Sequence, residues 1–190
     1  MPNKIFLGSI DDNVTFYLND LLRVKLEDHL DNTNRECMIE FSAKQKSEST
    51  KKIINIIQPF FEKSGIEVNL DKGYISYESY RFNSSQYVDT PIDIGCANEE
   101  QYDSQVCYII TKKDDRLKGG NMIIYDEYTL LNVIGYKDTV TKEIPLQSGS
   151  VLIITGDTYY KLKSCAGFGE LNLIRIGCYR NKPYRCDDDE

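Results

Sequence analysis

The spacing of hydrophobic positions follows two different periods along the chain, and the change comes near residue 66. In residues 13–30 apolar side chains recur every three or four positions, which predicts an amphipathic helix. Asn13 is the candidate cap for its start. His29 falls in its last turn, where an imidazole is favoured by the helix dipole, so we interpret it as a helix-end residue.

A second helical pattern covers residues 50–63, with Ser49 or Thr50 as the predicted N-cap. Its isoleucines and phenylalanines return at helical spacing. Pro59 interrupts the pattern, because proline lacks the backbone N–H that an interior helical position donates. We therefore expect the helix to kink or end near Gln58.

Beyond residue 66 the pattern changes to short apolar or alternating runs separated by glycine, aspartate and serine turns. A short strand at 36–41 precedes them, and the later strands are predicted at 67–70, 74–82, 106–111, 121–125, 130–136, 141–144, 150–155, 159–162 and 171–179. Many short strands after two helices indicate an antiparallel sandwich or barrel with helices packed on one face. The predicted fold class is α+β.

A chain of 190 residues is long enough to bury a full core as one domain. We assign a single domain to residues 1–186, with a helical N-terminal part at 1–65 and a β core at 66–180. The acidic residues 187–190 form a tail.

The formal net charge of −7 argues against a nucleic-acid partner and against binding to an anionic membrane. Residues 1–20 show no secretory signal, and no run is long enough to span a membrane. The six cysteines form no C-x-x-C pair, so we expect reduced thiols in the cytoplasm or nucleus instead of a zinc site. Abundant Asn, Ile, Lys, Asp and Tyr without Trp is typical of an AT-rich coding genome, such as that of a large DNA virus or of certain protists.

Three segments, taken in order and with their spacing, carry a resemblance to a known family. They are 80–93, then 107–110 followed by 118–125 with the pair Gly119-Gly120, then 145–160 running into 171–179. Together they resemble the prolyl-hydroxylase branch of the 2-oxoglutarate- and Fe(II)-dependent oxygenases. This resemblance implies a double-stranded β-helix, or jelly-roll-like, core. It also implies a tight Gly-Gly hairpin, since paired glycines let strands turn sharply.

The catalytic residues of that family do not carry over. The resemblance places its His-x-Asp motif at Pro91-Ile92-Asp93, or one residue earlier, which leaves Asp93 as the candidate carboxylate. Tyr159, Tyr160 and Lys161 stand where its second histidine belongs. Fe(II) in these enzymes needs two imidazoles and a carboxylate, and this chain has one histidine. We therefore predict no hydroxylase activity, no metal site and no bound cofactor.

The last strand of the family carries an arginine for the cosubstrate carboxylate. Here it offers Asn172, nearer the family's register, and Arg175, which alone could bind 2-oxoglutarate. With Asp93, Asp157 and Tyr160, Arg175 completes the polar groups that we expect at the barrel mouth.

The order of elements is a helix at 47–61, strands at 67–70, 74–83 and 106–110, the Gly-Gly segment at 118–125 and late strands at 151–162. This order resembles that of poxvirus virulence proteins that bind the host oxygen-sensing prolyl hydroxylase and whose prolyl-hydroxylase-like domain has lost its metal ligands. It implies a pseudoenzyme that acts on a protein partner, such as a host regulator, in the host cytoplasm. The candidate contact residues are Arg116, Lys118, Gly119, Gly120 and Tyr87, because loops and sheet edges are ready interaction surfaces.

Two other hypotheses stay open. One is an enzyme, including a 2-oxoglutarate-dependent oxygenase, with an altered site at the barrel mouth. The other is a cupin-like module that binds a small molecule. Metal content and cosubstrate binding discriminate these hypotheses from the protein-binding hypothesis.

Overall fold

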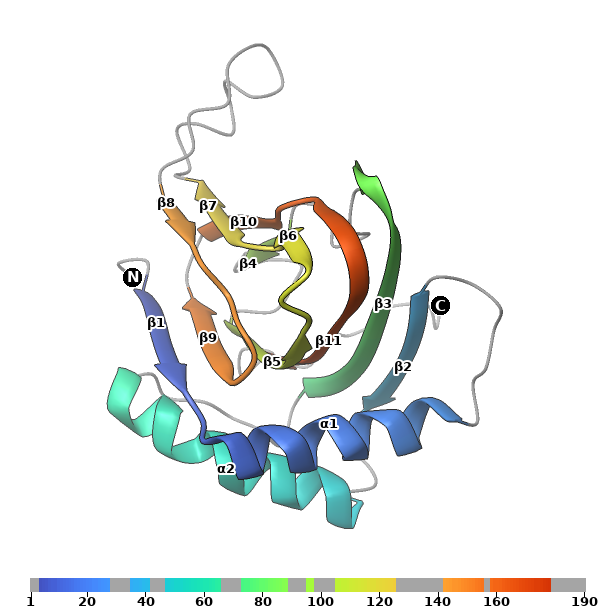
Figure 1. Ribbon diagram of the computed structural model, residues 1–190. Helices are drawn as coiled ribbons and strands as arrows, with labels where there is room; N and C mark the ends of the chain where they lie inside the picture. The colour runs from blue at the N-terminus through green and yellow to red at the C-terminus, as the bar shows by residue number, and fades with distance from the viewer. Residues whose placement is uncertain are drawn as a thin grey trace, which may run out of the picture.

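The computed structural model describes residues 4–27, 35–41, 47–65, 73–88, 95–97, 105–125, 142–155 and 158–178. The elements, labelled in Figure 1, are β1 (Lys4–Ser9), α1 (Asp12–Glu27), β2 (Arg35–Phe41), α2 (Glu48–Ser64), β3 (Gly73–Val88), β4 (Gly95–Ala97), β5 (Gln105–Lys113), β6 (Leu117–Gly119), β7 (Met122–Tyr125), β8 (Lys142–Ile144), β9 (Ser150–Thr155), β10 (Thr158–Leu162) and β11 (Cys165–Cys178).

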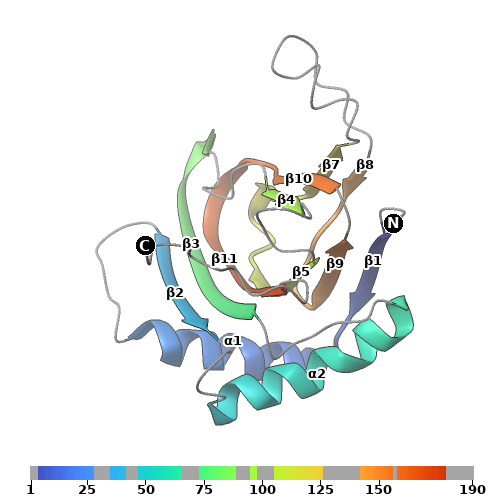
Figure 2. The same cartoon turned by 180° about the vertical axis from the view of Figure 1, so that it is seen from behind.

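Two antiparallel sheets face each other and enclose the core. The larger sheet has seven strands in the order β1-β9-β5-β11-β3-β2, with β6 also paired to β11, and the smaller has the order β4-β10-β7-β8. Figure 2 shows the smaller sheet lying over the curved larger sheet. The predicted α+β class and antiparallel barrel are therefore confirmed.

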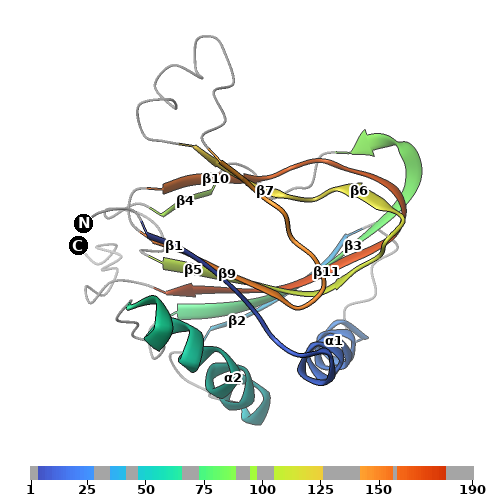
Figure 3. The ribbon, with the colours of Figure 1, turned by 60° about the vertical axis from the view of Figure 1, so that its left-hand side comes forward.

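Both helices cover the outer face of the larger sheet, which lies between them and the barrel interior (Figure 3). One hydrophobic cluster joins helices and sheet, and it includes Leu18 and Leu22 of α1, Ile53 and Ile57 of α2, and Ile174 of β11. Because these side chains are all fully buried, burying them is what fixes the helices on the sheet. No helix in the described ranges is long and apolar enough to cross a membrane.

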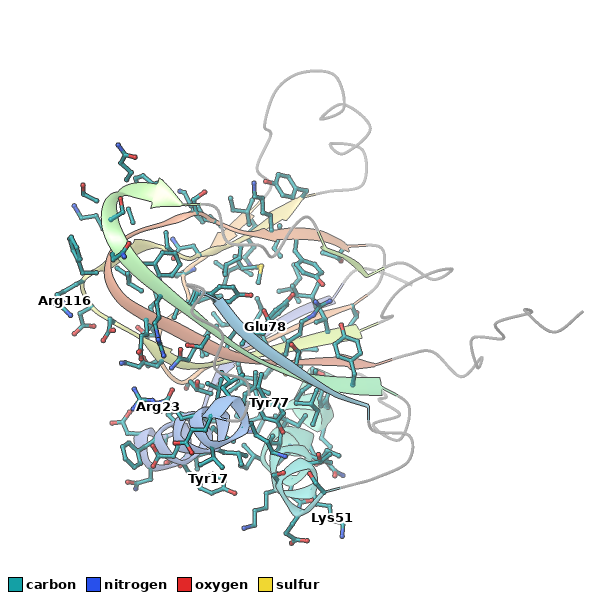
Figure 4. All side chains as sticks on the ribbon, turned by 90° about the vertical axis from the view of Figure 1, so that its right-hand side faces the viewer. Tyr17, Arg23, Lys51, Tyr77, Glu78 and Arg116 are labelled. Carbon is teal, nitrogen blue, oxygen red and sulfur yellow. The ribbon has the colours of Figure 1, made fainter. Side chains whose placement is uncertain are left out.

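Strand alternation separates the two faces of the larger sheet. On β3, Ile75 and Tyr77 belong to the cluster that joins helices and sheet, whereas Tyr80 and Phe82 belong to a second cluster inside the barrel. Side chains two residues apart on a strand share a face, so Glu78 points into the barrel with Tyr80. Figure 4 shows the same arrangement, with Tyr77 beside the helices and Glu78 between the sheets.

Several predicted elements are confirmed, including the strand at 150–155, which is β9, and the short strand that becomes β2. The sequence analysis missed β1, β4 and β6. As a result, the part of the chain at 1–65 supplies two strands, β1 and β2, to the larger sheet. The strands predicted at 67–70 and 130–136, the tail at 187–190 and His29 lie outside the described residues.

Three predictions about helix ends and continuity were wrong. α1 begins at Asp12 and its cap is Asp11, whose Oδ1 accepts the Val14 N–H at 2.9 Å. Ser47 caps α2 by accepting the Thr50 N–H at 3.2 Å. The short polar side chain immediately before the first turn takes the capping role in both helices.

α2 continues through Pro59 to Ser64. Pro59 itself is exposed. Ile57 and Phe61, two positions before and after it, are 0% and 3% exposed in the cluster that joins helices and sheet. Burial of these two side chains, each contributing roughly 1.5–3 kcal/mol, opposes the cost of about 3 kcal/mol for an interior proline. Tertiary packing therefore outweighs the local signal.

A buried polar network fixes α1 on the sheet. Asn172 on β11 is 1% exposed; its amide donates to Asn19 Oδ1 of α1 at 3.0 Å and its Oδ1 accepts the Ser79 hydroxyl at 2.7 Å. The Thr111 hydroxyl lies 3.3 Å from the same Asn19 oxygen. Because buried polar groups are costly unless they are paired, this network specifies one position of α1 along the sheet.

A charged cluster at the rim of the same contact centres on Glu170 of β11. Its carboxylate accepts from Lys112 at 2.9 Å and from Arg23 of α1 at 3.2 Å, and Arg81 of β3 lies 3.8 Å away. The hydrogen bond from Lys112 is the largest cause that lowers the pKa of Glu170, and Arg23 adds to it. Glu170 thus links one helix and three strands.

We expect Glu170→Gln to destabilise the protein by about 1 kcal/mol near neutral pH, since its ion pairs are partly solvent-exposed. The folded-state pKa lies below the ordinary value of 4.5, so this stabilisation is present above 4.5 and is lost as the pH falls through the folded value. Urea unfolding from pH 7 downward should show wild type and variant converging. Glu48→Gln, at an exposed helix-end pair, is the matched control, and a Glu170→Gln deficit that persists in acid would contradict the electrostatic explanation.

Candidate functional site

A carboxylate lies inside the barrel, between side chains of its own strand. Glu78 on β3 is 4% exposed. Its Oε1 accepts the Ser76 hydroxyl at 2.9 Å and its Oε2 accepts a short hydrogen bond from the Tyr80 hydroxyl. Both carboxylate oxygens therefore have partners two residues away on the same face of the strand, which offsets the cost of burial.

Two tyrosines and an arginine complete this interior cluster. The rings of Tyr108 on β5 and Tyr160 on β10 meet edge to face, with centroids 5.8 Å apart. The Arg175 guanidinium of β11 lies 5.5 Å from the Tyr74 ring and 5.9 Å from the Tyr108 ring. These distances are typical of cation–π contacts.

Tyr108 is a buried phenol whose pKa is strongly shifted. Burial is the main cause that raises its pKa well above the ordinary value of 10.0; Tyr160 raises it further and Arg175 opposes. The buried hydroxyl makes no hydrogen bond of good geometry with any described residue. A hydrogen bond with Tyr160 is a further cause of the raised pKa, and a buried hydroxyl of this kind could also bond to a ligand.

The cluster lies at one end of the barrel, where β5 and β10 begin and β11 ends; we call this end the barrel mouth. The structure brings together two of the four residues predicted there, Tyr160 and Arg175. The other two, Asp93 and Asp157, lie outside the described residues.

Sequence reasoning missed Glu78 and Tyr108 as members of this cluster. A signal for Glu78 was present, because Ser76, Glu78 and Tyr80 alternate with Ile75 and Tyr77 along one predicted strand.

Asn172, which the sequence analysis placed nearer the family's register than Arg175, does not face the barrel interior. Asn172 points out of the barrel toward α1, where Ser79 and Asn19 use its amide group. Arg175 has the parity of Leu173, an interior residue, and faces the barrel. On this strand a difference of one position decides whether a side chain meets the helices or the barrel interior.

The paired glycines do not form the predicted hairpin. β6 pairs with β11 in the larger sheet, whereas β7 pairs with β10 and β8 in the smaller sheet. Gly119 and Gly120 therefore form a corner at which the chain passes from one sheet to the other. Their φ angles of 86° and 67° lie in the left-handed region, which glycine adopts most easily.

Four exposed side chains gather at this corner, on three adjacent strands or the turn before them. Lys118 of β6 is opposite Ala166 of β11, and Tyr87 belongs to the end of β3 that pairs with the start of β11. Tyr87 is 62% and Phe168 53% exposed, and Arg116 is exposed in the turn before β6. Figure 4 shows Arg116 projecting from this end of the barrel. We call Tyr87, Arg116, Lys118 and Phe168 the corner surface.

Neither a protein-family model nor a curated protein sequence matches the chain. Solved structures do match. A Pseudomonas putida prolyl-4-hydroxylase has a TM-score of 0.59 at 7% identity, with 95% of each chain covered. A viral collagen prolyl hydroxylase from Paramecium bursaria chlorella virus 1, in its 2OG complex, has a TM-score of 0.51 at 15% identity, with 94% of this chain and 95% of that chain covered.

A third structure, an oxidoreductase of the 2OG-Fe(II) oxygenase family from Burkholderia pseudomallei, has a TM-score of 0.55 at 12% identity. The match covers 94% of this chain and 86% of the chain of that oxidoreductase. The chain thus has the double-stranded β-helix fold of the 2OG/Fe(II) oxygenases, as predicted. Identities this low show the fold alone.

The donors at the barrel mouth do not fit the iron centre of such oxygenases. The whole chain contains one imidazole, on His29, whereas the facial triad requires two. Within the described ranges, no three His, Cys, Asp or Glu side chains approach closely enough to hold a metal ion. The buried carboxylate present, Glu78, has both oxygens engaged by Ser76 and Tyr80.

The corner glycines provide a direct test of the local structure. A Cβ on Gly119 would overlap the Ser164 carbonyl oxygen, whereas a Cβ on Gly65, which has φ 67° at the end of α2, meets nothing within 4 Å. Gly65→Ala should cost about 1–2 kcal/mol for the left-handed backbone alone. Gly119→Ala adds overpacking and should cost about 3 kcal/mol or more. Equal losses in chemical denaturation would contradict the corner geometry.

Proposed function

We propose that this chain is a non-catalytic protein of the oxygenase fold that acts by binding another protein. The corner surface carries the proposal, because two large aromatic side chains, Tyr87 and Phe168, are more than half exposed there. Aromatic residues and arginine are enriched at protein interfaces and supply most of their binding hot spots.

The charge of the corner surface supports one kind of partner. Arg116 and Lys118 flank the aromatic residues in a chain whose net charge is −7. Basic side chains around an aromatic contact favour a partner with acidic groups, and they speed association with it. The backbone of Arg116 is packed against Gly167, since a Cβ on that glycine would overlap the Arg116 carbonyl oxygen. This part of the surface is therefore preorganised.

The lack of hydroxylase activity is supported by residue chemistry. One histidine cannot supply a two-histidine iron site, and the interior carboxylate is hydrogen-bonded within its own strand. An interior carboxylate that is bonded in this way stabilises the packed interior of the barrel.

We propose a host regulator, such as an oxygen-sensing prolyl hydroxylase, as the partner, met in the cytoplasm or nucleus. The support is the resemblance in element order to poxvirus virulence proteins and the viral type of composition. A scaffold of the partner's own fold class is also well placed to imitate its surface.

Charge reversal tests the role of the corner surface. We expect the double variant Arg116→Glu, Lys118→Glu to fold normally, since both side chains are exposed. The double variant should retain at least about tenfold less of a protein partner from host-cell extract at low salt than wild type does, because rim charges govern the association rate. Quantitative mass spectrometry of cross-linked complexes, followed by on-rates with the purified partner, provides the measurement.

The matched control is Lys51→Glu, Lys142→Glu, which makes the same charge change at exposed positions on α2 and β8. Tyr87→Ala and Phe168→Ala should reduce affinity with little effect on salt dependence. If all variants bind the same partner as wild type does, the corner surface is not the contact.

A second candidate function is favoured by the barrel mouth. Arg175 and the Tyr108 hydroxyl face the same interior space, and together they could bind the carboxylate of a small organic acid. This is the arrangement that an enzyme with an altered site, or a cupin-like binding module, would need.

Thermal denaturation with 2-oxoglutarate, with and without anaerobic Fe(II), separates these candidates. A ligand that binds the native state stabilises it by about 2.7 kcal/mol at a hundredfold excess over its dissociation constant. We expect no shift and no release of CO2. A shift without turnover that Arg175→Gln abolishes would support a small-molecule module, and a shift with 2-oxoglutarate decarboxylation would establish an enzyme and overturn the leading proposal.

A further inference from the structure

A cavity lies at the corner end of the barrel, away from the mouth. Its volume is about 380 Å³, and it is lined by Lys113, Asp114, Asp115, Leu117, Leu146, Gln147 and Ser148. The turn after β5 forms one wall, and the segment between β8 and β9 forms the other. The volume is at the lower end of the range for ligand pockets, roughly 300–1,000 Å³, and the mostly polar lining favours a small polar ligand.

Lys113 is a half-buried ammonium group with one acceptor. Its Nζ donates to the Leu146 carbonyl oxygen at 2.8 Å, and no carboxylate of the described residues lies within ion-pair distance of it. An ammonium has three N–H donors, so two have no protein acceptor among the described residues. Burial lowers the pKa of Lys113, which the neighbouring Cys165 partly opposes. An anionic group in the cavity would relieve this cost.

Asp115 is an anion on the same cavity, also without a described partner. Its neighbour Asp114 is already engaged, because its Oδ2 accepts the Glu170 N–H at 2.7 Å and lies 3.6 Å from Lys112. Asp115, by contrast, is exposed at the tip of the turn. Lys113 and Asp115 therefore line one cavity with opposite charges and do not pair with each other.

Opposite charges held apart on one wall of a small polar cavity match a ligand that carries both charges. We propose that this cavity binds a small zwitterion, an α-amino acid, with its carboxylate at Lys113 and its ammonium group at Asp115. A simple anion would meet the carboxylates of Asp114 and Asp115, and a simple cation would meet Lys113. Only a dipolar ligand pairs favourably with both charges.

The rest of the lining fits this assignment. The Ser148 hydroxyl accepts the Lys113 backbone N–H at 2.9 Å, so the two walls of the cavity are joined. The Gln147 side chain is exposed at the cavity, where its amide can bond to a polar side chain of the ligand. Leu117 and Leu146 reach from the barrel core and form an apolar floor. The site is independent of the corner surface and of the barrel mouth.

Three matched probes test the proposal with the full-length chain. L-serine carries both charges, ethanolamine lacks the carboxylate and 3-hydroxypropanoate lacks the ammonium group. We expect saturable amide shifts in heteronuclear NMR titrations with L-serine, centred on residues 113–117 and 146–148. The dissociation constant should be in the millimolar range or lower, and each single-charge probe should bind at least roughly tenfold more weakly, which corresponds to 1.4 kcal/mol.

Two variants remove one charge each at little structural cost. Lys113→Met keeps the aliphatic stem and Asp115→Asn keeps the shape of an exposed turn residue; both should weaken L-serine at least roughly tenfold. Lys142→Met, an exposed charge on β8 that does not line the cavity, should leave binding unchanged. Absence of saturation by L-serine at about 100 mM, where a millimolar ligand would be bound almost fully, overturns the proposal. Equal binding of the three probes, or undiminished binding by Asp115→Asn, also overturns it.

Discussion

Burial of the larger sheet on both faces is the constraint on which the rest of the structure depends. Its central strand β11 pairs with β3, β5 and β6, and Leu171 to Ile174 are each at most 1% exposed. A buried polar side chain on such a strand cannot form a hydrogen bond to solvent, so it must bond to a protein group. Asn172 finds its partners under α1, and Glu78 on the neighbouring strand finds its partners inside the barrel. Chemistry that must reach solvent is therefore confined to the two ends of the barrel.

This constraint also explains how much of the fold was predictable. A strand buried on both faces reads as a continuous apolar run, and β9 was predicted to the residue because all its six side chains are buried. β4 and β6, at three residues each, are too short to produce a pattern. Gly119-Gly120 was interpreted as a hairpin because local glycine chemistry fits either a hairpin or a corner. Only the non-local pairing of β6 with β11 and of β7 with β10 separates the two.

The candidate site shows the same limit at the level of single residues. Resemblance to the oxygenases placed Tyr160 and Arg175 at the barrel mouth, yet it placed Asn172 there as well, since one residue of register exchanges the two faces of β11. Glu78 was not predicted as a member of the site because a glutamate within an apolar strand is normally a surface residue. Its burial follows from Ser76 and Tyr80 at the two flanking positions of the same face, and a short alternating pattern of this kind can be recognised in a sequence once the strand is assigned.

The two ends of the barrel differ in the surroundings of their charged groups. At the mouth, Glu78 is hydrogen-bonded within its own strand and Arg175 lies over two aromatic rings, so the polar groups stabilise the barrel itself. At the corner end, Lys113 uses one of its donors and Asp115 has no described partner, while Tyr87 and Phe168 are exposed beside them in the fold. Natural sequences tolerate such unsatisfied features mainly where function requires them. The exposed aromatic side chains and the charges without a described partner therefore favour recognition at the corner end, and the Tyr108 hydroxyl leaves the mouth as the second candidate.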